Sequence, residues 1–405
     1  MKYPDSFFDY IGSHLHDDPS RLLLSDSNKE ADFDVREAVA QIVCRKKALK
    51  KLPAKCSRRE FIFPDTLSAE QASSEILADF HVSIAGDVRT VADLTAGLGV
   101  DAMAFAGKGC SVTAVERDPH KAETLGYNAG VMGIGNMEVV NCDASDFIQG
   151  TDKSWDLIYI DPARRSAAGK RTFAFSDCSP DIIRLMPELH GKSRTIIVKA
   201  SPMLDVSATM KSISGITDIY VISLRNECKE MLVKISTASP QPESSRAAIH
   251  AIDIGCCGKE SVFSIQASQM ENFQMPEIAD ASEYDSAKWI YEPNSSLMKT
   301  GAWGAIAARF PSLKKINVNT HLFVSDTLCN DFPGKIFEIY GWGTLRSDFA
   351  KSLRDKSLNI TTRNFPLSSD QLSKKLHIRQ GSSKEYLIAA TIAGERHCIF
   401  HAAII

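Results

Sequence analysis

The sequence lacks the patterns that mark metal-binding, disulfide-stapled and membrane-spanning chains. Its ten cysteines form no Cys-x-x-Cys pair and stand beside no closely spaced histidines, and most lie in apolar stretches, as small buried thiols do. No run of about 18 uncharged apolar residues occurs, and the N-terminal segment contains no apolar signal core. We therefore expect no metal site, no disulfide framework and no membrane association, in a soluble cytoplasmic protein.

A strong net charge is also missing. The 405 residues carry a formal charge of −3, so the field of the whole molecule indicates no nucleic-acid partner, and any basic surface must be local. One basic run exists: residues 45–59 hold eight Lys and Arg side chains and no acid. The run is either a solvated helix face or a patch that binds RNA phosphates. In the second case, the residues that bind RNA are Lys46, Lys47, Lys50 and Lys51.

The first part of the chain, residues 1–88, is predicted to be helical. Apolar residues recur at helical spacing up to Pro53, where a first long helix should end. A second helix is predicted to begin at Ser68, which forms a capping box with Gln71, and to continue through Phe80. The apolar content of 44% is ample for two or three domains of this kind.

From residue 89 to about 236, strands and helices alternate. The predicted strands are 90–96, 111–116, 137–144, 155–161, 194–200, 218–225 and 230–236. The first five, with helices between them, indicate a doubly wound parallel sheet. Only residues 226–229 join the last two strands, which is too short for a parallel crossover and predicts an antiparallel hairpin. Such a hairpin distinguishes class I methyltransferases from dinucleotide-binding dehydrogenases.

A glycine-rich turn, "DLTAGLG" at residues 93–99, follows the first of these strands and opens a helix. Gly97 and Gly99 let the backbone turn tightly and approach a ligand closely, and a helix N-terminus favours a negative group. Turns of this kind occur in many α/β proteins, so the motif alone is weak evidence for a cofactor site.

Acidic residues at the ends of four successive strands strengthen that interpretation. Asp93, Glu116, Asp143 and Asp161 should meet at the carboxyl edge of the sheet, where open α/β sheets bind ligands. Glu116 is placed to accept hydrogen bonds from two ribose hydroxyls, and Asp143 from an adenine amino group, with Ala144 leaving room for the ring. No phosphate-binding lysine stands in the turn, so this acidic edge suits S-adenosylmethionine (SAM), with its positive sulfonium, better than NAD. The predicted SAM-binding residues are Asp93, Ala96, Gly97, Gly99, Glu116, Arg117, Asp143, Ala144 and Asp161.

The stretch "YIDPARR" ends the fourth strand and is either a charged turn or the substrate side of an active site. In the second interpretation, the Asp161 carboxylate and the Pro162 carbonyl accept the N–H bonds of a base amine. The guanidinium of Arg164 stacks on the base, which has left its own stack. Arg165 then meets an RNA phosphate. Lys199, at the end of the fifth strand, contacts substrate or RNA phosphate, or simply extends from the sheet edge.

Two resemblances follow from these motifs. "VADLTAGLGVDAMAFAGKGCSVTAVERDP", "LIYIDPARR" and "RTIIVKASP" resemble segments of the small-subunit ribosomal RNA guanine-N2-methyltransferase J family, over roughly residues 90–205. The whole chain resembles bacterial class I methyltransferases that carry a ferredoxin-like connector and a THUMP-like C-terminal domain. THUMP modules bind structured RNA, often tRNA, in related enzymes. The resemblance implies an α/β protein with four domains. These are a helical domain (1–88), a methyltransferase domain (89–266), a ferredoxin-like connector (267–320) and a THUMP-like domain (321–405).

The predicted function is therefore SAM-dependent methylation of a base nitrogen in rRNA or tRNA, with guanine N2 as the leading target by resemblance. Methylation of uridine carbon 5 is disfavoured, because Ala200 and Ser201 stand where those enzymes need a nucleophilic cysteine. Two alternatives remain open: a SAM-binding RNA-binding protein without catalysis, and a methyltransferase for DNA adenine or protein. The sequence does not indicate an oligomeric state.

Overall fold

The computed structural model describes residues 2–24, 31–164, 175–238, 243–255, 258–270, 273–381 and 384–405, with only the backbone described for Arg164, Ser244 and Ala281. The chain divides into two compact units. The first comprises Met1–Leu204, Ala208–Ile216 and Leu232–Pro242, and the second comprises Asp205–Ser207, Thr217–Met231 and Glu243–Ile405. Among the described residues, no helix has the length and apolar character that a bilayer span requires.

Helices form the N-terminal part of the first unit, as predicted, but the first long helix ends at Ala48 and not at Pro53, which begins a separate short helix. They are α1 (Asp5–Ser13), α2 (Pro19–Leu23), α3 (Val35–Ala48) and α4 (Pro53–Cys56). Helix α3 is capped by Asp34, whose carboxylate accepts the backbone N–H of Arg36 at 2.8 Å. Its buried Val39 and Ile42 belong to an apolar cluster with Phe7 of α1. This cluster gives the N-terminal helices a core of their own.

The prediction of one helix from Ser68 through Phe80 is wrong in both its start and its length. Two helices occupy the segment, α5 (Thr66–Gln71) and α6 (Glu75–Ala85). The carboxylate of Asp65 accepts the N–H of Ser68 at 2.6 Å, so Ser68 lies inside α5 rather than at its cap. Ser74 then caps α6 through the N–H of Leu77. Two good capping residues at these positions divide the segment.

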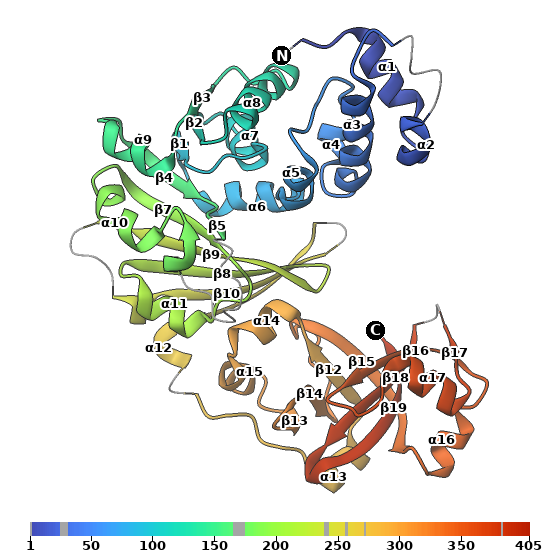
Figure 1. The fold of residues 1–405 in the computed structure, drawn as a ribbon. Coiled ribbons are helices and arrows are strands. Elements are labelled where there is room, and N and C mark those ends of the chain that lie inside the picture. The colour runs from blue at the N-terminus through green and yellow to red at the C-terminus, as the bar shows by residue number, and fades with distance from the viewer. Residues whose placement is uncertain are drawn as a thin grey trace. The chain divides into compact units, whose positions relative to one another are not determined.

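The central sheet has nine strands in the order β11-β10-β8-β9-β7-β4-β1-β2-β3. Their bounds are β1 (Thr90–Asp93), β2 (Ser111–Glu116), β3 (Met137–Asn141), β4 (Trp155–Ile160), β7 (Ser193–Ala200), β8 (Ile216–Leu224), β9 (Glu227–Ser236), β10 (Ala248–Ile254) and β11 (Glu260–Gln266). The pairs β3–β2, β2–β1, β1–β4 and β4–β7 are parallel, as predicted for a doubly wound sheet. The helices between or beside these strands are α7 (Val100–Gly107), α8 (Pro119–Val131), α9 (Ala144–Gly150), α10 (Ile182–His190) and α11 (Val206–Ser212). Figure 1 shows α7 and α8 together beside β1, β2 and β3.

The predicted hairpin is present, with a tighter turn than expected. Arg225 and Asn226 alone join β8 to β9, and both have positive φ angles, 55° and 62°. Two left-handed residues in succession suit a two-residue hairpin turn, in which Asn is one of the favoured residue types. The turn is fastened to β10, because the N–H of Asn226 donates to Asp253 Oδ1 at 2.8 Å. Strands β10 and β11 extend the same sheet, because β10 pairs in parallel with β8.

A second sheet of eight strands lies in the C-terminal half, in the order β13-β14-β12-β15-β19-β18-β16-β17. Its strands are β12 (Trp289–Pro293), β13 (Lys314–Asn317), β14 (Thr320–Ser325), β15 (Gly334–Thr344), β16 (Ser357–Arg363), β17 (Arg379–Gln380), β18 (Glu385–Ile392) and β19 (Arg396–Ile404). Helices α12 (Ala267–Met270), α13 (Ala281–Ser286), α14 (Ser295–Thr300), α15 (Trp303–Arg309), α16 (Asp348–Ser352) and α17 (Ser369–Leu376) complete this region. Strands β18 and β19 form an antiparallel pair in this sheet. Since β12 pairs directly with β15, the two predicted C-terminal modules share one sheet.

Candidate active site

The glycine turn between β1 and α7 is shaped by its two glycines in different ways. Gly99 has a φ of 82°, and a Cβ atom there would lie 2.0 Å from Cδ1 of Leu125 in α8, so only glycine fits this packing. Gly97 has a φ of 54°, but a Cβ atom at this position would meet nothing closer than the carbonyl oxygen of Thr95, 3.9 Å away. The space over Gly97 is therefore open, as a close-approaching ligand requires.

Glu116, at the end of β2, is fixed by two backbone donors. Its Oε2 accepts the N–H of Gly97 at 2.8 Å and its Oε1 accepts the N–H of Asp118 at 2.8 Å. The residue is 9% exposed, so it is a nearly buried acceptor beside the glycine turn. Each carboxylate oxygen can accept more than one hydrogen bond, so both remain able to accept from ligand hydroxyls.

The end of β3 is tied to the end of β2. The Nδ2 atom of Asn141 donates to the carbonyl oxygens of Glu116 at 2.8 Å and Arg117 at 3.0 Å. Asp143 follows and caps α9 by accepting the N–H of Ser145 at 2.8 Å. Capping occupies one oxygen of Asp143. That Asp143 accepts a hydrogen bond from the adenine amino group, and that the buried Ala144 leaves room for the ring, remain predictions. The same holds for Arg117, an exposed residue whose guanidinium lies 3.3 Å from Ser179 Oγ.

Asp161 follows β4 and lies next to the glycine turn. Its backbone N–H donates to Thr95 Oγ1 at 2.7 Å, and its Oδ2 accepts from the ammonium of Lys199 at 2.8 Å. The side chain of Asp161 is 38% exposed, whereas that of Lys199 is only 14% exposed. The ammonium of Lys199 also donates to Ser73 Oγ at 3.0 Å. A partly open carboxylate, held from two sides, therefore ends the fourth strand.

Two buried carboxylates behind this edge differ in their ionisation. Burial, followed by the nearby charge of Asp101, raises the pKa of Asp93 well above its ordinary value. Burial alone would raise the pKa of Asp101 as well, but His81, Lys199 and the hydroxyl of Ser73 lower it to about 2. Asp101 Oδ1 lies 2.7 Å from His81 Nδ1, and Asp101 Oδ2 accepts from Ser73 Oγ at 2.8 Å.

Sequence reasoning did not single out this group behind the edge. Asp101 lies in the first turn of a predicted helix, where an acid is favoured by the helix dipole. Its position therefore gives no signal of a functional role. Ser73 and His81 come from the segment before the sheet and belong to no recognisable motif. Only the tertiary packing of α6 against α7 brings them to Asp101.

The Asp-Pro motif is described only in part. Ala163–Arg164 forms strand β5, which pairs antiparallel with β6 (Cys178–Ser179). The side chain of Arg164 and the whole of Arg165 lie outside the described residues. Base stacking by Arg164 and phosphate binding by Arg165 therefore remain predictions.

The basic run is not uniformly exposed. Arg45 is buried and donates to four backbone carbonyls, among them those of Cys56 at 2.8 Å and Phe61 at 2.6 Å. Lys55 is buried against Glu75. The run therefore includes side chains that stabilise the fold of the N-terminal helices.

The four lysines predicted to bind RNA lie at the surface or close to it. Lys46 donates to the carbonyl of Asp17 at 2.5 Å, Lys47 pairs with the carboxylate of Glu70, and Lys51 donates to the carbonyl of Glu70. Lys50 is exposed. Exposed contacts of this kind are weak, so these ammonium groups remain able to meet phosphates.

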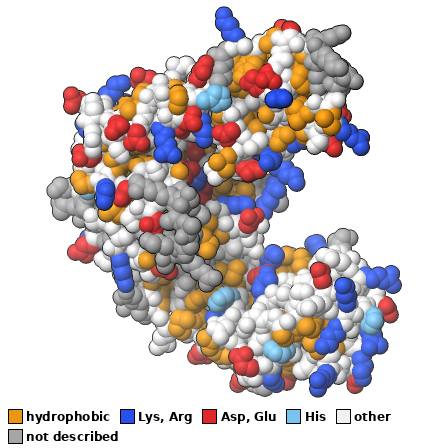
Figure 2. Space-filling model, viewed as in Figure 1, with side chains coloured by type: hydrophobic (Ala, Val, Ile, Leu, Met, Phe, Trp, Pro, Cys, Tyr) orange, Lys and Arg blue, Asp and Glu red, His pale blue; other side chains and the backbone are white. Residues whose placement is uncertain are grey.

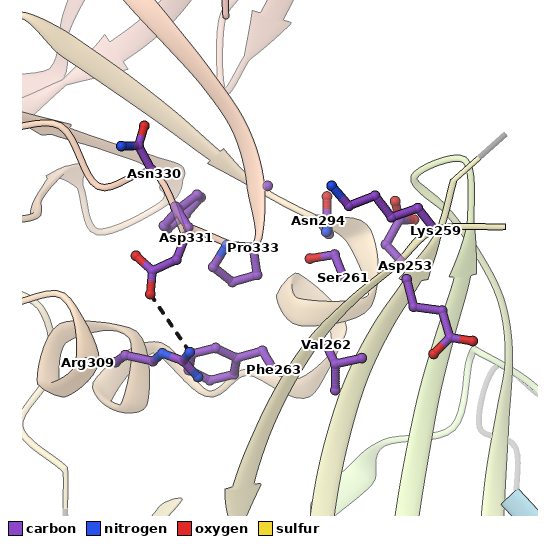
Figure 3. Close-up of a pocket in the computed structure, with 13 residues that line it drawn as sticks. Asp253, Lys259, Ser261, Val262, Phe263, Asn294, Arg309, Asn330, Asp331 and Pro333 are labelled. Carbon is purple, nitrogen blue, oxygen red and sulfur yellow. Dashed lines mark ion pairs between the residues drawn. The ribbon is translucent and has the colours of Figure 1, made fainter. Parts of the chain in front are cut away.

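A pocket of about 440 Å³ lies in the second unit, away from all of these residues in the sequence (Figure 3). Charges of both signs line the pocket: the cations Lys259 and Arg309 and the acids Asp253, Glu260 and Asp331. The guanidinium of Arg309 lies 3.9 Å from Asp331 Oδ2 and over the ring of Phe263. In the described part of the chain, its lining includes none of the residues predicted to bind SAM or RNA. No group of metal-ligating side chains was found among the described residues either.

Three segments of the chain match known protein families. Residues 71–173 match a family described as "Putative SAM-dependent methyltransferase", residues 289–333 a ferredoxin-like domain family, and residues 334–403 a THUMP domain-like family. The chain is similar to ribosomal RNA small subunit methyltransferase J of Hydrogenovibrio crunogenus, with 28% identity over 165 residues, 34% of this chain and 60% of that protein. It is also similar to the protein of that name from Francisella tularensis subsp. novicida, with 30% identity over 83 residues, 18% of this chain and 34% of that protein. The chain thus spans less than two thirds of the length of either relative.

A solved structure covers the whole chain. It is a crystal structure described as a putative methyltransferase from Porphyromonas gingivalis W83, with a TM-score of 0.85, 25% identity and 100% coverage of both chains. The predicted resemblance and fold class are thereby confirmed. The chain therefore has a methyltransferase fold, and by the order of its matched segments it is similar to SAM-dependent methyltransferases that carry a ferredoxin-like and a THUMP-like domain.

Proposed function

We propose that the protein transfers a methyl group from SAM to a base nitrogen of ribosomal or transfer RNA in the cytoplasm, with guanine N2 as the leading target. The observation that carries this proposal is the position of Asp161. Its carboxylate is partly open at the end of β4 and accepts from Lys199, while its backbone N–H donates to Thr95 of the glycine turn. A carboxylate in this place can align a nucleophilic amine with a methyl donor bound at the turn.

The residues at the sheet edge fit SAM. The open space over Gly97 admits a ligand against the backbone, and Glu116 offers two anchored oxygens to ribose hydroxyls. Asp143 and Ala144 would border the adenine, and the acids at the edge suit a positive sulfonium. SAM, when bound, supplies an electrophilic methyl group.

The chain's own part in the transfer is to hold the amine. The Asp161 carboxylate and the Pro162 carbonyl accept its N–H bonds and keep the nitrogen lone pair directed at the methyl carbon. As the new N–C bond forms, the bond between the methyl carbon and the sulfonium sulfur would break, with its electron pair left on sulfur. The carboxylate can then take the proton that the nitrogen loses. Ala200 and Ser201 at the end of β7 offer no thiol for attack on a pyrimidine ring, which supports direct transfer to nitrogen over transfer to uridine carbon 5.

RNA is supported as the substrate by three separate observations. The similar curated proteins are named as ribosomal RNA methyltransferases, and the C-terminal part matches a THUMP domain-like family. The third observation is charge: residues 346–384 expose more cations than acids. The exposed cations there are Arg346, Lys351, Arg354, Lys356, Lys374, Lys375, Arg379 and Lys384, and the exposed acids are Asp348, Asp355 and Asp370. Figure 2 shows Lys and Arg side chains spread over the visible face of the C-terminal region. Such a surface attracts phosphates.

Single-turnover methylation tests the proposal. Labelled SAM is mixed with the protein and with RNA purified from cells that lack the protein. The rate of Asp161→Asn is compared with that of Asp152→Asn. Asp152 is an exposed acid before the start of β4, at the opposite end of the strand from Asp161. We expect Asp161→Asn to lower the rate by about a hundredfold or more and to leave SAM affinity near wild type. Equal rates in the two variants would contradict the role of Asp161.

A further inference from the structure

The ammonium of Lys199 connects the proposed catalytic carboxylate to the segment before the sheet. It lies 2.8 Å from Asp161 Oδ2 and 3.0 Å from Ser73 Oγ. Ser73 is the residue before Ser74, which caps α6. One side chain of β7 therefore bridges the end of β4 and the start of a helix that belongs to the N-terminal segment.

We propose that Lys199 is a positioning residue, which holds the Asp161 carboxylate in its reactive orientation and is itself held in place by Ser73. This inference rests on the proposed role of Asp161. It gives Lys199 a different task from the phosphate contact that its place in the sequence suggested.

The direction of the hydrogen bonds explains why Ser73 is suited to this task. Its hydroxyl donates to Asp101 Oδ2 at 2.8 Å, so its oxygen presents a lone pair to the lysine ammonium. Asp101 is anchored in turn by His81, whose Nδ1 lies 2.7 Å from Asp101 Oδ1. A rotatable hydroxyl is thereby fixed in one orientation, and the lysine in one conformation.

Charge balance supports the same role. The carboxylates of Asp161 and Asp101 both interact with the one ammonium of Lys199, and Glu116 is a further acid at this edge. Like charges this close disfavour one another, and a buried charge is tolerated when it is paired. Lys199 therefore keeps Asp161 attracted toward β7, where otherwise the neighbouring acids would repel it.

Burial distinguishes this role from phosphate binding. The side chain of Lys199 is 14% exposed, whereas that of Asp161 is 38% exposed. A phosphate would have to reach a nearly covered ammonium and displace the acidic partner it already has. The more open carboxylate is the group that faces an incoming substrate.

The segment that holds Ser73 is also fastened to the basic run. The N–H of Glu75 donates to the carbonyl oxygen of Lys51 at 3.0 Å. The position of Ser73 is therefore set by the N-terminal helices as well as by its contacts with Asp101 and Lys199.

Three variants and one control test the inference. Lys199→Met removes the charge and keeps the length of the side chain, Lys199→Arg keeps the charge, and Ser73→Ala removes only the hydroxyl. Lys108→Met, at an exposed lysine after α7, is the control. The single-turnover methylation rate at saturating SAM and RNA, the SAM affinity by calorimetry and the half-saturating RNA concentration are measured for each.

We expect Lys199→Met to lower the single-turnover rate about tenfold or more, with SAM affinity and half-saturating RNA concentration within about threefold of wild type. Ser73→Ala should lower the rate in the same direction by less, Lys199→Arg should restore part of it, and the control should match wild type. If Lys199→Met instead raises the half-saturating RNA concentration and leaves the saturated rate unchanged, Lys199 binds phosphate and the inference is overturned.

A second measurement decides the inference without any methylation. Thermal unfolding midpoints are compared for Lys199→Met, Asp161→Asn and the double variant. Since the two groups form one ion pair, the double variant should lose less than the sum of the single losses. Additive losses would show that Lys199 does not hold Asp161. If the wild-type protein methylates no RNA, only the proposed function is refuted. The comparison of unfolding midpoints would still test whether Lys199 and Asp161 are paired.

Discussion

The contributions of the Asp93 and Asp101 carboxylates to the stability of the fold change in opposite directions with pH. Burial raises the pKa of Asp93 well above 3.8, whereas the partners of Asp101 overcome burial and lower its pKa to about 2. A depressed pKa means that the ionised form of Asp101 stabilises the fold at neutral pH, and that this contribution is lost as pH falls from about 4 toward 2. A raised pKa means the reverse for Asp93, whose contribution is full at low pH and is lost as pH rises above 3.8.

We therefore predict opposite effects of two matched substitutions on the free energy of unfolding. At pH 7, Asp101→Asn should destabilise the protein by roughly 2 kcal/mol, because it removes a charge that is paired in the folded state. This difference from wild type should narrow below about pH 4. Asp93→Asn keeps the oxygen that accepts the N–H of Thr95 and should leave stability at pH 7 unchanged or higher.

Urea unfolding of wild type and both variants at several pH values between 7 and 3 measures these effects. A constant difference between wild type and Asp101→Asn over this range would contradict the account of the Asp101 ion pair.

Glu116 is predicted to carry much of the SAM affinity. Glu116→Ala removes the acceptor for ribose hydroxyls and also frees the N–H groups of Gly97 and Asp118. Loss of charge-assisted hydrogen bonds should cost about 1.5–3 kcal/mol, or roughly ten- to a hundredfold in affinity. Titration calorimetry with SAM checks this, with Glu138→Ala, an exposed acid of β3, as the control. Unchanged affinity in Glu116→Ala would refute the assignment of the cofactor site.

At the scale of the element, the turn between β1 and α7 contains two glycines with different predicted roles. Gly99 is required by packing, and Gly97 is predicted to lie against the ligand. Gly99→Ala should destabilise the fold by about 1–3 kcal/mol, because its Cβ would meet Leu125. Gly97→Ala meets no neighbour and should cost about 1–2 kcal/mol of backbone strain, while it weakens SAM binding more than Gly99→Ala does. Thermal unfolding and calorimetry on both variants separate the two roles. Equal SAM affinities would mean that no ligand approaches Gly97.

The basic run makes an element-scale prediction about RNA. Changing Lys46, Lys47, Lys50 and Lys51 to Glu should weaken RNA binding and reduce the slope of log affinity against log salt by about 0.7–0.9 for each phosphate that is no longer neutralised. SAM affinity should stay near wild type, because these residues belong to the N-terminal helices. Filter binding at several salt concentrations measures the slope, and charge reversal at Lys108 and Lys153 is the control. An unchanged slope would make the run a solvated helix face.

At the scale of the whole molecule, the sequence predicted what depends on local patterns. The alternation of strands and helices and the short link between β8 and β9 were enough for the sheet and its hairpin. The split between α5 and α6 was missed because Asp65 caps α5 and Ser74 caps α6, whereas the predicted cap Ser68 lies inside α5. The contacts of Ser73 and His81 with Asp101 were beyond prediction, because they join residues about 20 to 28 positions apart through the packing of two helices.

The central claim is that this chain methylates RNA at a base nitrogen with SAM as donor. Mass spectrometry of nucleosides from the ribosomal and transfer RNA of a strain that lacks the chain, compared with its parent, tests it most directly. The account predicts that one N-methylated nucleoside is absent or depleted in the deletion strain and returns with the wild-type chain, but not with Asp161→Asn. Identical nucleoside profiles in the two strains, with SAM binding intact in the purified protein, would contradict it.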